Sequence, residues 1–356
     1  MKEKKIESNQ FKCKGCGGNL IYSPDSKDLL CPKCSNHYKI EKTKTFIRHP
    51  LDKTKAKTDV EYKEFIAENK IFRCNNCGAN VILNNYEITK DCPYCNTSLI
   101  ADEKSLPGMK PDAIIPFEFN KEIASEKFVQ GVKKRFLVPR KFKKKIPESD
   151  ISAFYIPSFG YDAKTQSSYN GRLYETYTTT DSEGHTQTHT RHFNISGTYN
   201  QNFKNVMVES SSKMCQSDLN GFLPYKYSDL QDYNNCYILG YSAENYDKDA
   251  YESIPEYKDM VHFYIRNGIL SQYHYSGVDY LNINTNYSDE QYFYCFLPVY
   301  RFEYKFKKKN YSTYMNGQTG QVDKNLPKSK LKIAMIVISI LLAFLIPLIL
   351  SLTLSN

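Results

Sequence analysis

The chain has 356 residues, a length that usually corresponds to two or three domains. Its 48 Lys and Arg against 39 Asp and Glu give a net charge of +9, too small an excess to define a nucleic-acid-binding protein by itself. The 11 cysteines follow no apolar N-terminal segment, which argues against a secreted disulfide-bonded protein and favours reduced or metal-bound thiols.

Two four-cysteine modules are predicted near the N-terminus, over residues 11–40 and 71–101. Each contains two C-x-x-C pairs separated by 14 residues, close to the spacing of zinc ribbons. A shift of 61 positions carries Gly17 onto Gly78 and each cysteine of the first module onto one of the second, so the module is duplicated. The predicted metal ligands are Cys13, Cys16, Cys31 and Cys34 in the first module, and Cys74, Cys77, Cys92 and Cys95 in the second.

Both modules are predicted to hold a structural Zn²⁺, because about 30 residues make too small a core to fold without metal. Four thiolates fill a tetrahedral site and leave no open position, which argues against catalytic zinc. Iron is the alternative that a four-sulfur site also accepts. A zinc ribbon can bind a protein, bind nucleic acid or only stabilise the chain. Few aromatic side chains are placed to stack on bases, which favours a protein partner.

A charged segment over residues 41–70 is predicted to be a linker, with a helix at 60–68. The run 113–117 then begins an α+β domain over residues 113–322. Apolar residues at helical spacing predict a helix at 121–136. Eight basic residues follow within 133–145, and a membrane-facing surface, an ordinary solvated surface and a nucleic-acid site are open interpretations of them.

Most of the 30 tyrosines lie between residues 151 and 314, in short Tyr/Phe-rich runs separated by Asn, Gly, Asp and Ser. Such aromatic runs favour half-buried sheet faces and predict short strands joined by turns. One hairpin is predicted from 174–180 and 185–193, and residues 244–260 are predicted to be helical in part. The predicted fold class is therefore α+β, with β dominant.

Two further groups carry metal-binding or nucleophilic side chains. On a strand, His185 and His189 share one face and His192 lies on the other, so the three do not converge on a metal. The thiols outside the modules are expected to be buried and unreactive because no His is near them in sequence; they are Cys215, Cys236 and Cys295. No catalytic residue and no small-molecule substrate are predicted, so we expect a protein that is not an enzyme.

Residues 333–354 carry no charge and would extend about 33 Å as a helix, enough to cross a bilayer. A basic segment over 323–332 precedes them, and the positive-inside rule then keeps the rest of the chain cytoplasmic. The sequence therefore predicts a single-pass, tail-anchored protein of the cell membrane. Its basic segments could also attract anionic lipids of the inner membrane.

Four motifs follow one another in a fixed order along the chain: Ile114–Phe117, Tyr155–Ala163, Leu297–Tyr300 and Asn316–Gly320. Together with the two ribbons and the terminal span, they resemble the bacterial transcription-factor-IIB-type zinc-ribbon membrane proteins, often labelled primosomal-helicase-like. The helicase label finds no support, because no G-x-x-x-x-G-K-[ST] phosphate loop occurs.

This resemblance implies a membrane-tethered recruiter of cytoplasmic proteins, similar to those associated with phage-shock-protein-A-type envelope-stress systems. With closed metal sites and no catalytic constellation, the leading hypothesis is a non-enzymatic membrane adaptor with a cytoplasmic protein partner. A membrane-attached nucleic-acid-binding protein is the alternative, and a hydrolase built on His and Asp residues of the β-domain is a third hypothesis.

Overall fold

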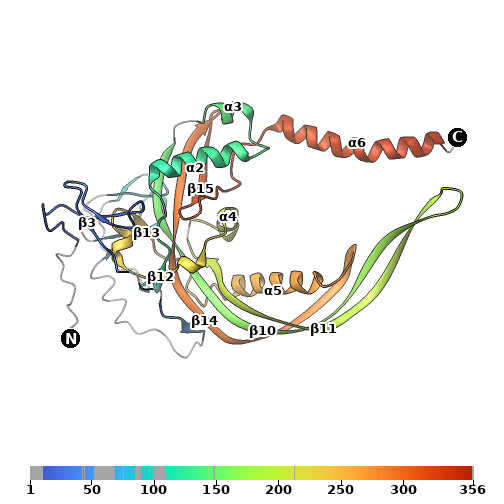
Figure 1. Cartoon of the computed structure of the whole chain (residues 1–356), viewed down its shortest axis with the longest axis horizontal. Helices are drawn as coiled ribbons and strands as arrows, with labels where there is room; N and C mark the ends of the chain where they lie inside the picture. Colours follow the sequence, from blue (N-terminus) through green and yellow to red (C-terminus); the bar gives the residue numbers. More distant parts are fainter. Residues whose placement is uncertain are drawn as a thin grey trace.

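Three long antiparallel strands organise the molecule. β10 (Asp150–Thr180) lies between β11 (Thr186–Glu209) and β14 (Gly277–Phe306), and the three curve away from the body as an arm (Figure 1). The predicted α+β, β-dominant fold is confirmed. The structure is a computed structural model that describes residues 11–41, 43, 45–51, 69–74, 76–84, 90–95, 97–99, 109–146, 149–211 and 213–354.

The long strands differ from the predicted short ones, since β10 has 31 residues and β14 has 30. Residues that indicate turns in the sequence lie inside the strands instead. Gly160 faces Phe293 across the ladder, and a Cβ at Gly160 would come within 2.2 Å of that ring. The glycine therefore makes room for an aromatic ring and does not mark a turn.

The base of the long sheet is covered on both faces and the arm mainly on one. At the base, residues 154–161 of β10 are buried without interruption, as expected for a strand packed on both sides. Along the arm, burial alternates from 163 to 173 because α5 (Ile254–Leu270) covers one face. Tyr257 of α5 stacks on Tyr161 with ring centroids 4.5 Å apart.

The helix predicted at 121–136 is present as α2 (Lys121–Lys134). Asn120 caps it by accepting a hydrogen bond of 2.9 Å from the Ile123 amide. Phe128 stacks at 4.1 Å on Phe302 of β14, so α2 covers the base of the sheet. The structure also describes four shorter helical segments: α3 (Arg140–Lys144), α4 (Gln216–Phe222) and 3₁₀ turns at Tyr227–Asp229 and Asn235–Ile238.

Among the described residues, the main sheet has ten strands, in the order β12-β9-β14-β10-β13-β6-β5, with β11 added to β10 and both β15 and β4 added to β14. β5 is Asn69–Arg73 and β6 is Asn80–Asn84. Other short members of the sheet include β4 (His49–Pro50), β9 (Ala113–Ile114), β12 (Gln231–Asp232), β13 (Ser242–Glu244) and β15 (Lys309–Asn316). β4 belongs to the segment 41–70 that the sequence predicts as a linker. Its described residues pack on the body, and Arg48 pairs with Asp162 at 2.8 Å. The helix predicted at 60–68 lies outside the described residues.

The apolar C-terminal segment forms α6 (Lys330–Leu354), a helix long and apolar enough to cross a membrane. None of its most apolar 18-residue window is buried inside the structure.

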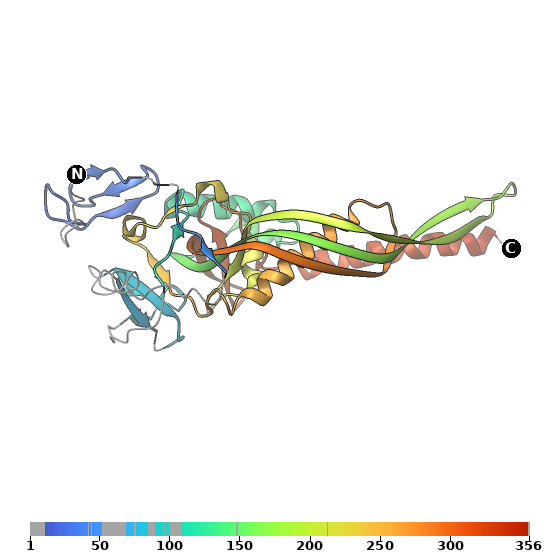
Figure 2. The same ribbon diagram turned by 90° about the horizontal axis from the view of Figure 1, so that it is seen from below.

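The hairpin predicted from 174–180 and 185–193 is also present, with β10 ending at Thr180 and β11 beginning at Thr186. This arm tip and α6 project from the body to the same side (Figures 1 and 2).

Candidate metal centres and their attachment to the body

Each cysteine module brings its four sulfurs together. In the first module, Sγ of Cys13 lies 3.3 Å from Sγ of Cys34, and Cys16 lies 3.5 Å from Cys31. In the second, the corresponding distances are 3.5 Å for Cys74 to Cys95 and 3.6 Å for Cys77 to Cys92. All four sulfurs of each module lie within 4.8 Å of one another. The predicted ligand sets are thus the two groups that the structure assembles.

The local backbone explains why these sulfurs converge. The Cys13 amide donates to the Gly18 carbonyl at 2.7 Å, and the Gly17 amide donates back to the Cys13 carbonyl at 2.8 Å. The second module repeats both bonds, with the Gly78 amide 2.7 Å from the Cys74 carbonyl. Gly17 and Gly78 have φ of +71° and +74°, a left-handed conformation that glycine adopts without steric cost.

The donor set fits a tetrahedral metal. Sulfurs bound to one Zn²⁺ at about 2.3 Å lie about 3.8 Å apart, close to the separations found in both modules. The same separations are far beyond the length of a disulfide, about 2.05 Å. With four sulfurs in each group, a bound Zn²⁺ would be held by cysteine alone and would have no free coordination position.

The first module, which contains β1 (Ile21–Ser23), β2 (Asp28–Leu30) and β3 (His37–Tyr38), is attached to the body through Tyr22. The Tyr22 amide donates to the Leu239 carbonyl at 2.9 Å, and its buried hydroxyl donates to the Phe117 carbonyl at 3.2 Å. These bonds bury one side of the module and leave Cys16 and Cys34 exposed.

The second module contributes strands to the main sheet. Its strands are β5 (Asn69–Arg73), β6 (Asn80–Asn84), β7 (Lys90–Asp91) and β8 (Ser98–Leu99). β6 pairs with β13, which pairs in turn with β10.

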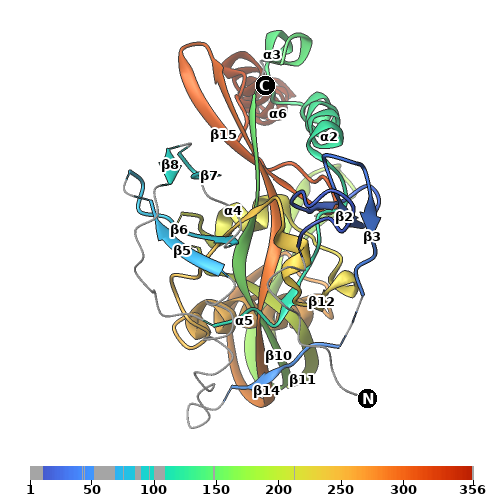
Figure 3. The same cartoon turned by 90° about the vertical axis from the view of Figure 1, so that its left-hand side faces the viewer.

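Side chains also join the second module to the body. Arg301 of β14, a buried residue, donates to the Pro93 carbonyl at 2.6 Å, and Tyr94 donates to the buried carboxylate of Glu244. Figure 3 shows the two modules on either side of the central strands.

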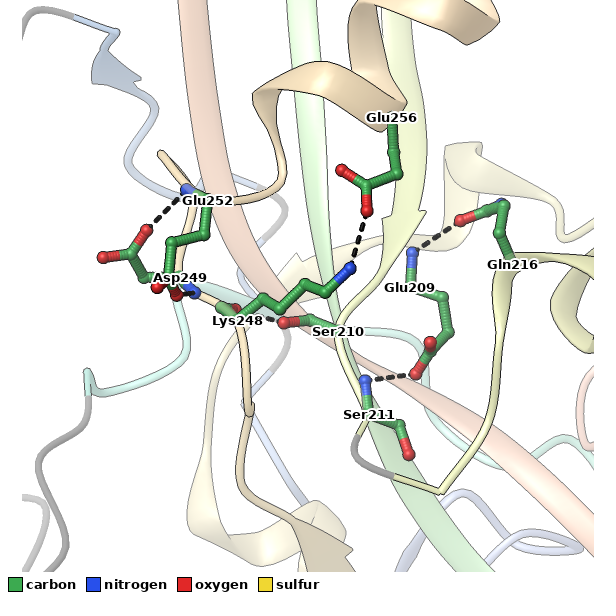
Figure 4. A network of polar contacts seen from close by, with 8 residues as sticks. All are labelled: Glu209, Ser210, Ser211, Gln216, Lys248, Asp249, Glu252 and Glu256. Atoms are coloured by element: carbon green, nitrogen blue, oxygen red, sulfur yellow. Dashed lines mark hydrogen bonds and ion pairs between the residues drawn. The ribbon is translucent and has the colours of Figure 1, made fainter.

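A network of polar residues lies beside this junction, around the end of β11 (Figure 4). Glu209 accepts a hydrogen bond from the Ser211 amide, and its own amide donates to Gln216 at 2.8 Å. Burial raises the pKa of the Glu209 carboxyl from 4.5 to about 9, and the nearby Glu244 adds to the shift. At the opposite, more exposed side of the network, Lys248 pairs with Glu256 at 2.6 Å and holds the pKa of Glu256 below its ordinary value.

The raised pKa of Glu209 predicts that the folded chain loses stability as pH rises from about 4.5 to 9, since the unfolded chain releases this proton earlier. We expect Glu209→Gln to remove that loss and to stabilise the chain at pH 8 by on the order of 2 kcal/mol. Thermal unfolding in detergent at pH 5.5 and pH 8, followed by circular dichroism, measures the difference.

Glu256→Gln is the matched control for Glu209→Gln, because Glu256 is the partner of an ion pair at the same network. It should lower stability slightly at pH 8. Equal effects of the two changes, or a Glu209→Gln effect that does not depend on pH, would contradict the assignment of a protonated Glu209.

The other candidates from the sequence do not form a site among the described residues. His192 bonds to Asp279 at 2.7 Å, His189 bonds to Thr179 at 2.8 Å, and His185 lies 3.3 Å from Asp181. The three histidines therefore have separate partners, and His185 lies just before β11 and not on the strand as predicted.

The three thiols outside the modules have different environments. Cys295 is buried in β14 as predicted, and burial raises the pKa of its thiol well above the ordinary value. Cys236 is half-buried. The prediction is wrong for Cys215, which is exposed because it immediately precedes α4, where its amide donates to Asp218 at 3.1 Å.

Sequence reasoning missed the residues that attach the modules. Arg301 directly follows the uncharged, aromatic run 292–300 of β14, and a charge next to such a buried run is a signal that it has a buried partner. Its partner in the second module, the Pro93 carbonyl, is 208 positions away, so the sequence could have indicated Arg301 without identifying what it binds there.

The fold and the sites define a β-dominant protein with two four-cysteine groups that could hold metal and one apolar C-terminal helix. The chain is similar to Uncharacterized protein YdjG of Bacillus subtilis (strain 168), with 27% identity over 326 residues that cover 91% of this chain and 92% of that protein. The similarity therefore extends well beyond the cysteine modules. No family model matches the chain, and no solved structure matches it.

Proposed function

We propose that this chain is a non-enzymatic adaptor, anchored in the cell membrane by α6, that presents two zinc ribbons to a cytoplasmic protein partner. The observation that supports it most is the position of the modules. Both lie at the end of the body away from α6 and the arm tip (Figure 2). The ribbons are therefore remote from the end of the chain that would enter the bilayer.

The charges around α6 support this orientation. Lys324, Lys328, Lys330 and Lys332 precede or begin the helix, and basic residues are retained on the cytoplasmic side of a span. The cytoplasm is also the compartment in which cysteine thiolates stay reduced and available to zinc. The family resemblance of the sequence supports a role in envelope stress.

The polar arm restricts how α6 can enter a membrane. Its tip, residues 175–191, is exposed and consists mainly of Thr, His and charged residues, which hydrocarbon would exclude. Because the arm and α6 project to the same side in Figure 1, α6 has to turn away from the arm at its base when it inserts.

Affinity purification of the full chain from detergent-solubilised membranes, with and without nuclease, tests the adaptor. We expect a stoichiometric protein partner that resists nuclease and is lost from a Cys31→Ser variant, which keeps α6 and should remain in the membrane. Partners that disappear after nuclease treatment would favour the nucleic-acid-binding alternative. A partner that the Cys31→Ser variant retains in full would contradict a role for the first module.

A further inference from the structure

A basic corner beside the base of α6 forms a second candidate membrane contact. We define the corner as residues 133–145, which include the end of α2, the following loop and α3. The Ser329 amide donates to the Leu137 carbonyl at 2.8 Å. Lys332 Nζ donates to the carbonyls of Phe136 at 2.6 Å and Val138 at 3.1 Å. The corner is therefore attached to the first turn of α6.

The corner is held rigidly against the sheet. Phe142 is fully buried, and its ring lies 5.3 Å from that of Tyr304 and 5.0 Å from that of Phe306. Lys143 Nζ donates to the Lys133 carbonyl at 2.7 Å, which ties α3 to the end of α2. Side chains on the outer surface are thus presented by a fixed backbone.

The outer surface of the corner combines unpaired cations with one exposed aromatic ring. None of its exposed basic side chains forms an ion pair with another residue in the part of the chain that the structure describes. Phe136 is 65% exposed, and Lys332 Nζ lies 5.0 Å from the centre of its ring. The exposed basic residues are Lys133, Lys134, Arg140, Lys141, Lys144 and Lys145.

We propose that the basic corner binds the anionic headgroups of the membrane that α6 enters, with the Phe136 ring inserted among them. Lys and Arg attract phosphodiester and other anionic groups at a bilayer surface, and an aromatic ring is favourable at the boundary between headgroups and acyl chains. Because the corner is bonded to the first turn of α6, it lies beside the point at which the helix would enter the bilayer.

This inference rests on the proposed membrane anchorage, and the absence of Trp from the chain allows the two to be tested separately. Three full-length variants each introduce one Trp: Phe136→Trp in the corner, Phe344→Trp in α6, and Phe263→Trp in α5. Phe344 and Phe263 are 75% and 59% exposed, so all three positions are open to a surrounding medium. Each variant is reconstituted into vesicles of phosphatidylcholine, with or without phosphatidylglycerol, that contain lipid brominated close to the headgroup or deep in the chain.

We expect the F136W fluorescence to shift to the blue and to be quenched by shallow bromines in the vesicles with phosphatidylglycerol, roughly twofold more than that of F263W. High salt, or the added changes Arg140→Gln, Lys141→Gln and Lys144→Gln, should reduce this quenching. Quenching of F344W by deep bromines reports the insertion of α6.

The outcomes distinguish the two proposals. Unquenched F344W would overturn the anchorage itself. If F344W is quenched but F136W is quenched no more than F263W, the anchorage stands and the lipid contact is overturned. The same holds if the quenching of F136W does not depend on phosphatidylglycerol. A response of F136W to added duplex DNA in place of anionic lipid would also overturn it and would assign the corner to nucleic acid.

Discussion

Replacement of Cys92 by serine is expected to lower the zinc content of the purified chain from two ions to one. Cys92 is fully buried, and its sulfur lies 3.6 Å from that of Cys77. Structural zinc sites bind with about 10–16 kcal/mol at neutral pH, and this affinity depends on all four ligands. Elemental analysis of protein purified with stoichiometric zinc measures the change.

The same substitution should also destabilise the body, because the second module is part of the main sheet. When the module unfolds, Glu244 loses its Tyr94 partner and Arg301 loses the Pro93 carbonyl. A buried polar group that loses a hydrogen-bond partner costs about 1–3 kcal/mol. The first module adds no strand to that sheet, so Cys31→Ser should lower zinc content equally and melting temperature less.

Cys236→Ser is the control, since Cys236 is a half-buried thiol outside both modules. It should retain two zinc ions. A full zinc content in the Cys92→Ser variant would show that the second group is not a zinc site, and iron in the wild-type chain would replace zinc in the interpretation of both modules.

The cysteine groups were predictable because their geometry is local. Within each module, the ligands lie inside one short segment, and the turn that presents the first cysteine pair is encoded by the glycine that follows it, Gly17 or Gly78. The attachment of the modules was not predictable in the same way. Tyr94 and Glu244 are 150 positions apart, and no periodicity relates them.

The length of the strands was difficult to predict because polar residues lie on their covered face. Thr165 and Ser167 are buried under α5, where a simple pattern would place apolar residues. Ser167 satisfies its hydroxyl by bonding to Thr285 of β14 at 2.9 Å. Because such polar pairs replace apolar contacts, the alternation of apolar and polar residues along each strand becomes weak. The sequence then resembles a series of short strands with turns.

The helix α6 supplies the last prediction. Changing Leu341 and Leu342 together to Arg should release the chain from the membrane, since both lie near the middle of the helix and are exposed along its surface. Each Arg at the centre of a span opposes insertion by about 2.5–3.5 kcal/mol, so the pair opposes it by about 6 kcal/mol. We expect the variant to appear in the soluble fraction after alkaline extraction of membranes, as should a chain that lacks residues 333–354.

Leu331→Arg is the matched control, because Leu331 is 72% exposed but lies in the first turn of α6, among lysines that would stay at the membrane surface. This variant should remain in the pellet. Both soluble variants should still bind two zinc ions, since the modules are attached to the body through Tyr22 and Arg301 and not through α6. If the double Arg variant stayed in the pellet, α6 would not be the anchor, and the basic corner or a membrane-bound partner would have to hold the chain there.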